Sequence, residues 1–78
     1  MSHQYRYTVI LDPDPDDGGY SVYVPALPGC ISQGETRDEA LANAREAIAL
    51  HVESLAKDGL PVPEEETKPE AIEVTVAA

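Results

Sequence analysis

The sequence predicts an α+β fold of the form β-β-β-α-β, in which one mixed four-stranded sheet in the order 3-2-1-4 is covered on one face by a single helix. Apolar and polar residues alternate in four short segments, at residues 5–11, 20–24, 30–35 and 71–76, which is typical of strands. Between the third and fourth segments the apolar period lengthens to 3.6 residues, as in an amphipathic helix. A right-handed crossover from the third strand would then place the last strand beside the first, in parallel.

The chain of 78 residues is long enough for one domain, which we place at residues 1–78. A chain of this size buries only about 60% of the surface that its unfolded form exposes, so its margin of stability is thin. Association would bury further apolar surface, and on that ground we expect a homo-oligomer.

The first two predicted strands form a hairpin. Residues 5–11 place their aromatic and apolar side chains on one face, and residues 20–24 repeat the pattern with Tyr20, Val22 and Val24. The acidic loop at residues 12–19 joins them, because its prolines cannot donate to a strand ladder and its glycines permit the return.

The best-marked element is a helix at residues 36–58. Thr36 and Glu39 form a capping box, in which the Thr36 hydroxyl accepts from the N–H of Glu39 and the Glu39 carboxylate reaches back to the N–H of Thr36. Gly59 suits the position after the helix, and the prolines that follow prevent its continuation. The apolar stripe comprises Leu41, Ala44, Ile48, Val52 and Leu55.

The last predicted strand, at residues 71–76, points Ile72, Val74 and Val76 towards the helix. The opposite face of the sheet then carries Ile10 and Tyr23 with no helix to cover them. Exposed apolar and aromatic side chains on a bare sheet are typical of a binding surface.

The charge of the chain restricts its partners. Fifteen acidic residues against five basic ones give a net charge of −10, so we expect no direct binding to nucleic acid and no membrane surface as a partner. A basic protein partner, or simple solubility, fits this charge. No apolar segment suggests a membrane span or a leader peptide, and the single cysteine, Cys30, cannot form an internal disulfide. These features predict a cytoplasmic protein.

The acidic loop does not meet the requirements of a calcium site. Asp12, Asp14 and Asp16 have the opening spacing of a calcium-binding loop. However, Asp17 stands where the turn glycine is needed, and Tyr23 stands where a bidentate glutamate is needed. We expect no metal site.

The sequence offers few side chains that could carry out catalysis. Cys30 is more typical of a small buried residue than of a nucleophile, and one cysteine with two histidines cannot build a structural zinc site. A metal-dependent nuclease would need a carboxylate on the first strand, whose middle offers only Arg6 and Thr8. We therefore expect no enzyme activity and no cofactor.

One stretch of the chain carries a distinctive pattern, made of residues 19–30 (GYSVYVPALPGC), 33–36 (QGET) and 39–48 (EALANAREAI). This pattern resembles the HicB-type antitoxin domain, and the resemblance covers nearly the whole chain. It implies a partial ribonuclease H-like fold without catalysis, and the role of a non-catalytic antitoxin in a type II toxin–antitoxin system. It also implies a partner, a small basic HicA-type toxin that cleaves RNA and whose RNA surface the antitoxin would block.

Members of this family often carry a C-terminal DNA-binding segment, whereas this sequence stops after the last predicted strand. We therefore expect no autorepression by the chain itself. The alternative function is a stand-alone oligomeric regulatory domain of the same fold without a toxin partner. A small basic protein encoded in the neighbouring reading frame would favour the antitoxin.

Eight residues are the predicted partner contacts. Two lie on the uncovered face of the sheet, three in the acidic loop, and three in the acidic run after the helix: Ile10, Tyr23, Asp14, Asp16, Asp17, Glu64, Glu65 and Glu66.

Overall fold

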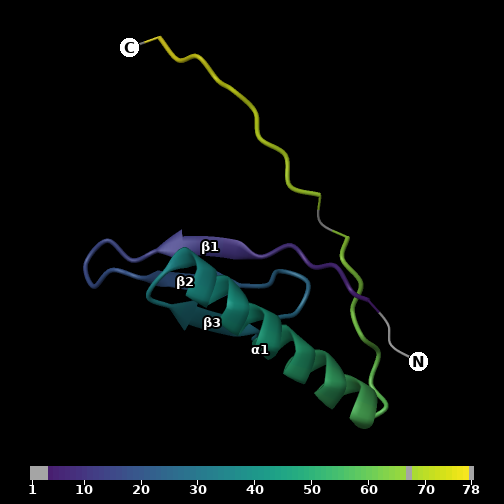
Figure 1. Cartoon of the computed structure of the whole chain (residues 1–78). Helices are drawn as coiled ribbons and strands as arrows, with labels where there is room; N and C mark the ends of the chain where they lie inside the picture. Colours follow the sequence, from purple (N-terminus) through teal and green to yellow (C-terminus); the bar gives the residue numbers. More distant parts are fainter. Residues whose placement is uncertain (1–3, 67, 78) are drawn as a thin grey trace.

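Three short strands and one helix make up the folded part of the chain. The computed structural model describes residues 4–66 and 68–77. The elements are β1 (Ile10–Pro13), β2 (Tyr20–Tyr23), β3 (Ile31–Gly34) and α1 (Arg37–Lys57). Figure 1 shows the strands side by side, α1 along one face of the sheet, and residues 68–77 extending away from both.

The sheet is an antiparallel meander in the order β1-β2-β3. Tyr23 in the central strand lies opposite Ile10 of β1 and Ile31 of β3. The strand β1 begins later than the predicted segment at residues 5–11, because its partner β2 ends at Tyr23. Beyond that point the same register would place Thr8 opposite Pro25, which has no N–H to donate.

The core lies between the sheet and the first turns of α1. It has two adjoining clusters, whose six buried residues are Val22, Ala40 and Ala44 in one, and Val24, Leu27 and Cys30 in the other. Small helix residues let α1 approach the sheet closely. Gly34 is required at the end of β3, because a Cβ there would lie 2.4 Å from the backbone nitrogen of Ala40.

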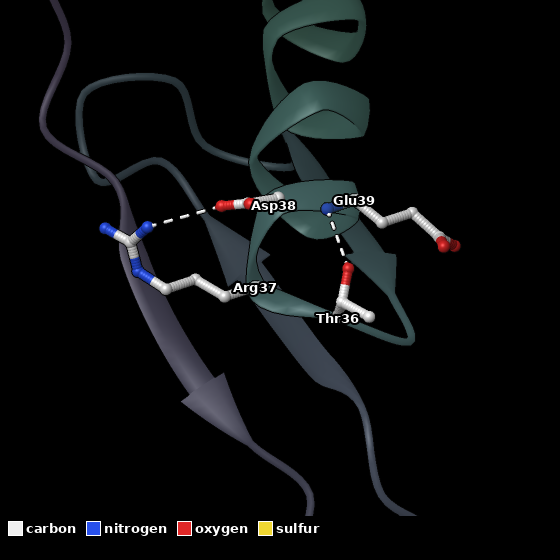
Figure 2. Close-up of polar contacts among 4 residues, drawn as sticks. All are labelled: Thr36, Arg37, Asp38 and Glu39. Carbon is white, nitrogen blue, oxygen red and sulfur yellow. Dashed lines mark hydrogen bonds and ion pairs between the residues drawn. The ribbon is translucent and has the colours of Figure 1, made fainter.

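The start of α1 confirms the predicted N-cap in part. The Thr36 hydroxyl accepts a hydrogen bond from the N–H of Glu39 at 3.1 Å, as Figure 2 shows. The Glu39 carboxylate does not reach the N–H of Thr36 as predicted, and instead accepts from the N–H of Glu35 at 3.4 Å. Beside the cap, Arg37 and Asp38 form an exposed ion pair with 3.5 Å between nitrogen and oxygen (Figure 2), an interaction that contributes little to stability.

The end of α1 was also predicted correctly. Gly59 has a φ of 70°, and its N–H donates to the carbonyl of Ala56 at 3.1 Å. The N–H of Leu60 donates to the carbonyl of Leu55 at 2.9 Å. This pair of bonds satisfies two of the last helix carbonyls, and the left-handed backbone that they require favours glycine.

The predicted fold class is wrong in its fourth strand. The sheet has three antiparallel strands, so the mixed four-stranded sheet in the order 3-2-1-4, with its partial ribonuclease H-like topology, is not formed. No strand is present in residues 68–77. Ile72, Val74 and Val76, predicted to face the helix, are between 70% and 83% exposed.

The segment that follows α1 gives the physical reason. The Tyr7 hydroxyl donates to the carbonyl of Pro63 at 2.6 Å, and the N–H of Thr8 donates to Glu65 Oε1 at 2.5 Å. These contacts hold residues 60–66, which we call the linker, parallel to residues 4–9, which we call the N-terminal segment. Continued straight, the chain would bring Ile72 about 23 Å past Glu65, whereas only about 17 Å separates Thr8 from the end of β1 at 3.3 Å per residue. A strand at residues 71–76 in this register would therefore overrun the end of β1, and residues 68–77 extend away from the sheet instead (Figure 1).

Candidate functional site

A row of apolar side chains crosses the face of the sheet that α1 leaves uncovered. Ile10, Tyr23 and Ile31 stand opposite one another on three adjacent strands, and side chains paired in this way contact across the sheet. Tyr23 is 45% exposed and Ile31 is 69% exposed, while Ile10 is half-buried. We call these three residues the open-face row. It presents apolar surface on a support that the sheet holds in place.

Ile31 was missed by the sequence prediction, although a signal for it was present. Cys30 is buried towards the helix, and side chains alternate along a strand. Its neighbour Ile31 must therefore point to the opposite face. The apolar row is consequently longer than the pair of Ile10 and Tyr23 that was predicted.

The acidic loop has an internal structure that separates its three predicted contact residues. Asp14 Oδ1 accepts hydrogen bonds from the N–H of Asp16 at 2.9 Å and of Asp17 at 3.1 Å. The bond from Asp17, and to a smaller extent the bond from Asp16, holds the pKa of Asp14 below its usual value. Asp14 therefore organises the turn, whereas Asp16 and Asp17 are exposed.

A cleft of about 770 Å³ opens between this loop and the start of α1. Four carboxylates line it, from Asp14, Asp17, Glu35 and Glu39. None of the described residues around it is a lysine or an arginine. The electrostatic environment therefore favours a cationic group of a partner. The sequence predicted Glu39 only as part of the capping box and Glu35 only as the end of the third strand, and neither as a contact.

The acidic run at Glu64–Glu66 lies beside the N-terminal segment of the chain. Glu65 accepts the hydrogen bond from Thr8 described above and so helps to hold the linker in place. Glu64 and Glu66 are exposed and border a hollow of about 350 Å³ next to Pro25. The run is therefore divided between a structural residue and two surface residues.

Tyr7 marks the contact between the linker and the N-terminal segment. Its ring stacks on that of Tyr5, with 6.1 Å between ring centroids and 10° between ring planes. Burial raises the pKa of the Tyr7 hydroxyl, and the nearby Tyr5, Glu64 and Glu65 raise it further. The hydroxyl therefore stays protonated and able to donate to Pro63.

The structure does not gather the eight predicted residues into one site. The acidic loop lies at one end of β1 and the linker lies near the other, with the open-face row between them (Figure 1). Three separate surfaces are therefore available to a partner.

Cys30 has the environment of a structural residue. It is buried, and burial raises the pKa of its thiol, so the reactive thiolate is disfavoured. In residues 4–66 and 68–77, no group of three or more His, Cys, Asp or Glu side chains is arranged to hold a metal ion. In the same residues, no helix has the length and apolar character needed to span a bilayer.

Comparison of sequences identifies relatives over nearly the full chain. The family described as HicB_like antitoxin of bacterial toxin-antitoxin system matches residues 7–77. UPF0150 protein Ta0767 of Thermoplasma acidophilum is 48% identical over 73 residues, which are 94% of this chain and 99% of that protein. Antitoxin HicB 1 of Photorhabdus laumondii is 40% identical over 68 residues, which are 81% of this chain and 43% of that antitoxin.

Two solved structures are similar to the chain. A chain of the HicA3 and HicB3 toxin-antitoxin complex has a TM-score of 0.65 and 33% identity, covering 81% of this chain and 71% of that one. The N-terminal domain of the Burkholderia pseudomallei antitoxin HicB has a TM-score of 0.61 and 38% identity, covering 90% of this chain and 69% of that one. These relatives are antitoxins, a generally non-catalytic class, which confirms the prediction that the protein is not an enzyme. The chain belongs to the HicB-like antitoxin family of bacterial toxin–antitoxin systems.

Proposed function

We propose that the protein is an antitoxin that binds and occludes a small basic RNA-cleaving toxin of the HicA type in the cytoplasm, without chemistry of its own. The observation that carries this proposal is the similarity to a chain of the HicA3 and HicB3 complex, at a TM-score of 0.65. The net charge of −10 supports it, because an acidic surface attracts a basic partner.

The open-face row is the surface that we propose for the apolar part of the contact. Tyr23 stands at its centre, and tyrosine supplies a large contact area at low cost in conformational entropy. The exposed carboxylates of Asp16 and Asp17 at one end, and of Glu64 and Glu66 at the other, would steer the basic toxin by charge.

Co-expression with the small basic protein encoded next to this chain tests the function. The expected result is relief of the toxin's growth arrest, together with co-purification of the two proteins. Growth arrest that persists, with no co-purification, would overturn the proposal and favour the stand-alone regulatory domain.

Three alanine variants test the surface. Tyr23→Ala should raise the Kd for the toxin about thirtyfold, as expected for a central contact residue, and Ile31→Ala should raise it by a smaller factor. Leu50→Ala is the matched control, since Leu50 is 67% exposed on α1 and lies outside the open-face row. Isothermal titration calorimetry measures all three. Equal affinities would show that the toxin binds elsewhere.

The acidic contribution is separable by kinetics. Replacing Asp16 and Asp17 by Asn should slow association at low salt and have little effect at high salt, where charges are screened. Stopped-flow fluorescence measures both rates. An unchanged association rate at low salt would remove the acidic loop from the contact.

A further inference from the structure

We propose that residues 71–76 of one chain add as a strand to the open edge of β1 in a second copy, so that two copies exchange their tails. We call residues 71–76 the tail segment. The proposal concerns pairing between two chains and does not depend on the toxin.

The tail segment has the composition of a strand and has no strand partner within the described residues. Ile72, Val74 and Val76 are 83%, 70% and 78% exposed, and they alternate with Glu73 and Thr75. An extended backbone then carries all three apolar side chains on one side. Such a segment is suited to adding to the edge of a sheet.

Of the two edges of the sheet, that of β3 is blocked by α1 at its Gln33–Gly34 end. The side-chain amide of Asn43, on α1, donates a 2.8 Å hydrogen bond to the carbonyl of Gln33 in β3. Gly34, the last residue of β3, lies directly against the backbone of Ala40. A further strand would have to displace the helix contact to pair there.

The edge of β1 is open at Leu11. The N–H of Asp14 donates to the carbonyl of Gly19 at 3.0 Å, and hydrogen-bonded pairs alternate along an antiparallel ladder. The pairs of Asp12 with Ser21 and of Ile10 with Tyr23 are then hydrogen-bonded. The N–H and C=O of Leu11 consequently point away from β2, where an added strand can reach them.

A groove beside this edge offers room for the apolar side of the tail segment. It measures about 330 Å³ and lies between the N-terminal segment that precedes β1 on one side and α1 on the other. Val9, Leu41 and Ile48 are among the residues that line it. Arg6 and Arg45 also line the groove.

The tail segment complements this groove in both apolar character and charge. Ile72, Val74 and Val76 would point into the groove and pack against Leu41 and Ile48. Glu70 precedes Ile72 by two residues and so falls on the same side of an extended chain. It would meet the two arginines of the groove.

The chain's own tail does not occupy this position. Its linker is held beside the N-terminal segment at Tyr7 and Thr8, and residues 68–77 extend away from the sheet and α1 (Figure 1). A second copy, which approaches from outside, has no such restriction. The exchange therefore gives hydrogen-bond partners to the free backbone groups at the edge of β1. It also buries the apolar side of the tail segment in both copies.

Sedimentation velocity on the full chain tests the exchange, and we expect a dimer. Val74→Asp should raise its Kd at least about a hundredfold, since two tails per dimer each lose a buried valine. Thr75→Asp, on the opposite side of the same segment, should change the Kd by less than about threefold. Both side chains are exposed in the single chain, so neither variant should disturb the fold. A chain that stays monomeric, or a dimer that Val74→Asp leaves unchanged, would overturn the proposal.

Isotope-filtered NMR on a mixture of labelled and unlabelled chains distinguishes exchange from folding back. The proposal predicts intermolecular NOEs from the methyl groups of Val74 to those of Leu41 or Ile48. NOEs confined to one chain would show that the tail occupies its own groove, and would contradict the exchange.

Discussion

Two segments of the chain have the same alternating pattern and different structures. In β2, Val22 is fully buried, with a strand on each side and α1 across one face. In the tail segment, Val74 is 70% exposed and pairs with no strand of the described chain. Alternation states which side of a segment is apolar. A neighbour within reach decides whether that side is buried.

The largest effect should come from breaking the contact that shelters β2. Gly34→Ala should lower the free energy of unfolding by about 3 kcal/mol, because the new Cβ would meet backbone atoms of Ala40 that cannot turn aside. Urea unfolding followed by circular dichroism measures the loss. Gly18→Ala is the control. Gly18 has a φ of 74° and open space around it, so only the backbone cost of about 1 kcal/mol is expected. Equal losses of unfolding free energy in the two variants would mean that α1 shifts to make room for the new Cβ at little cost.

A matched pair of valine variants compares the two segments directly. Val22→Ala should lower the free energy of unfolding by about 2 kcal/mol, since it removes buried methyl groups and leaves a cavity. Val74→Ala should change it by less than about 0.5 kcal/mol at a protein concentration low enough to keep the chain monomeric. Urea unfolding of both variants provides the measurement. Similar losses would show that the tail is packed within a single chain.

A matched pair of threonine variants makes the same comparison for a helix end. Thr36→Ala removes the acceptor for the N–H of Glu39 and should cost about 1 kcal/mol. Thr75→Ala in the tail segment should have an effect below about 0.5 kcal/mol. Thermal unfolding by calorimetry detects the difference. Equal melting temperatures for the two variants would show that the N-cap contributes nothing to stability.

The smallest effect concerns acid and the loop between β1 and β2. The pKa of Asp14 is lowered in the folded chain by the two backbone bonds it accepts, that from Asp17 first. A lowered folded pKa stabilises the chain above the unfolded pKa, and this contribution is lost as the pH falls through the folded value. An NMR titration should therefore place the Asp14 carboxyl below its value in a loop peptide. Asp14→Asn should keep the turn and abolish this part of the acid sensitivity, whereas an unshifted titration would contradict the loop geometry.

The sequence alone predicted those elements whose ends are set by residues close together in the chain. Thr36 and Glu39 mark the start of α1, and Gly59 marks its end, through contacts that span a few residues. The hairpin of β1 and β2 also depends on a nearby loop. The bounds of β2 and α1 were predicted closely because neighbours in the chain decide them, whereas β1 begins at Ile10 and not at residue 5 as predicted.

The sequence alone did not predict the structure of segments whose contacts are with residues far away in the chain. The tail segment lost its strand because Tyr7 and Thr8 hold the linker at Pro63 and Glu65, and no local pattern announces these contacts. Of the site, Ile10 and Tyr23 lie on the uncovered face as expected. Ile31 required only that alternation be followed from Cys30.

The single hydrogen bond from Asn43 to Gln33 also bears on the resistance of the protein to aggregation. Growth of sheets into fibrils needs an unpaired edge on both sides of each molecule, so that every addition exposes the next. Here the amide of Asn43 takes up the outward-pointing carbonyl of Gln33 at one end of β3, and β1 ends in Pro13, which has no N–H to offer. Both edges therefore offer fewer free backbone groups to a neighbouring sheet. The side chain of one helix residue thus makes edge-to-edge growth of this small sheet less favourable.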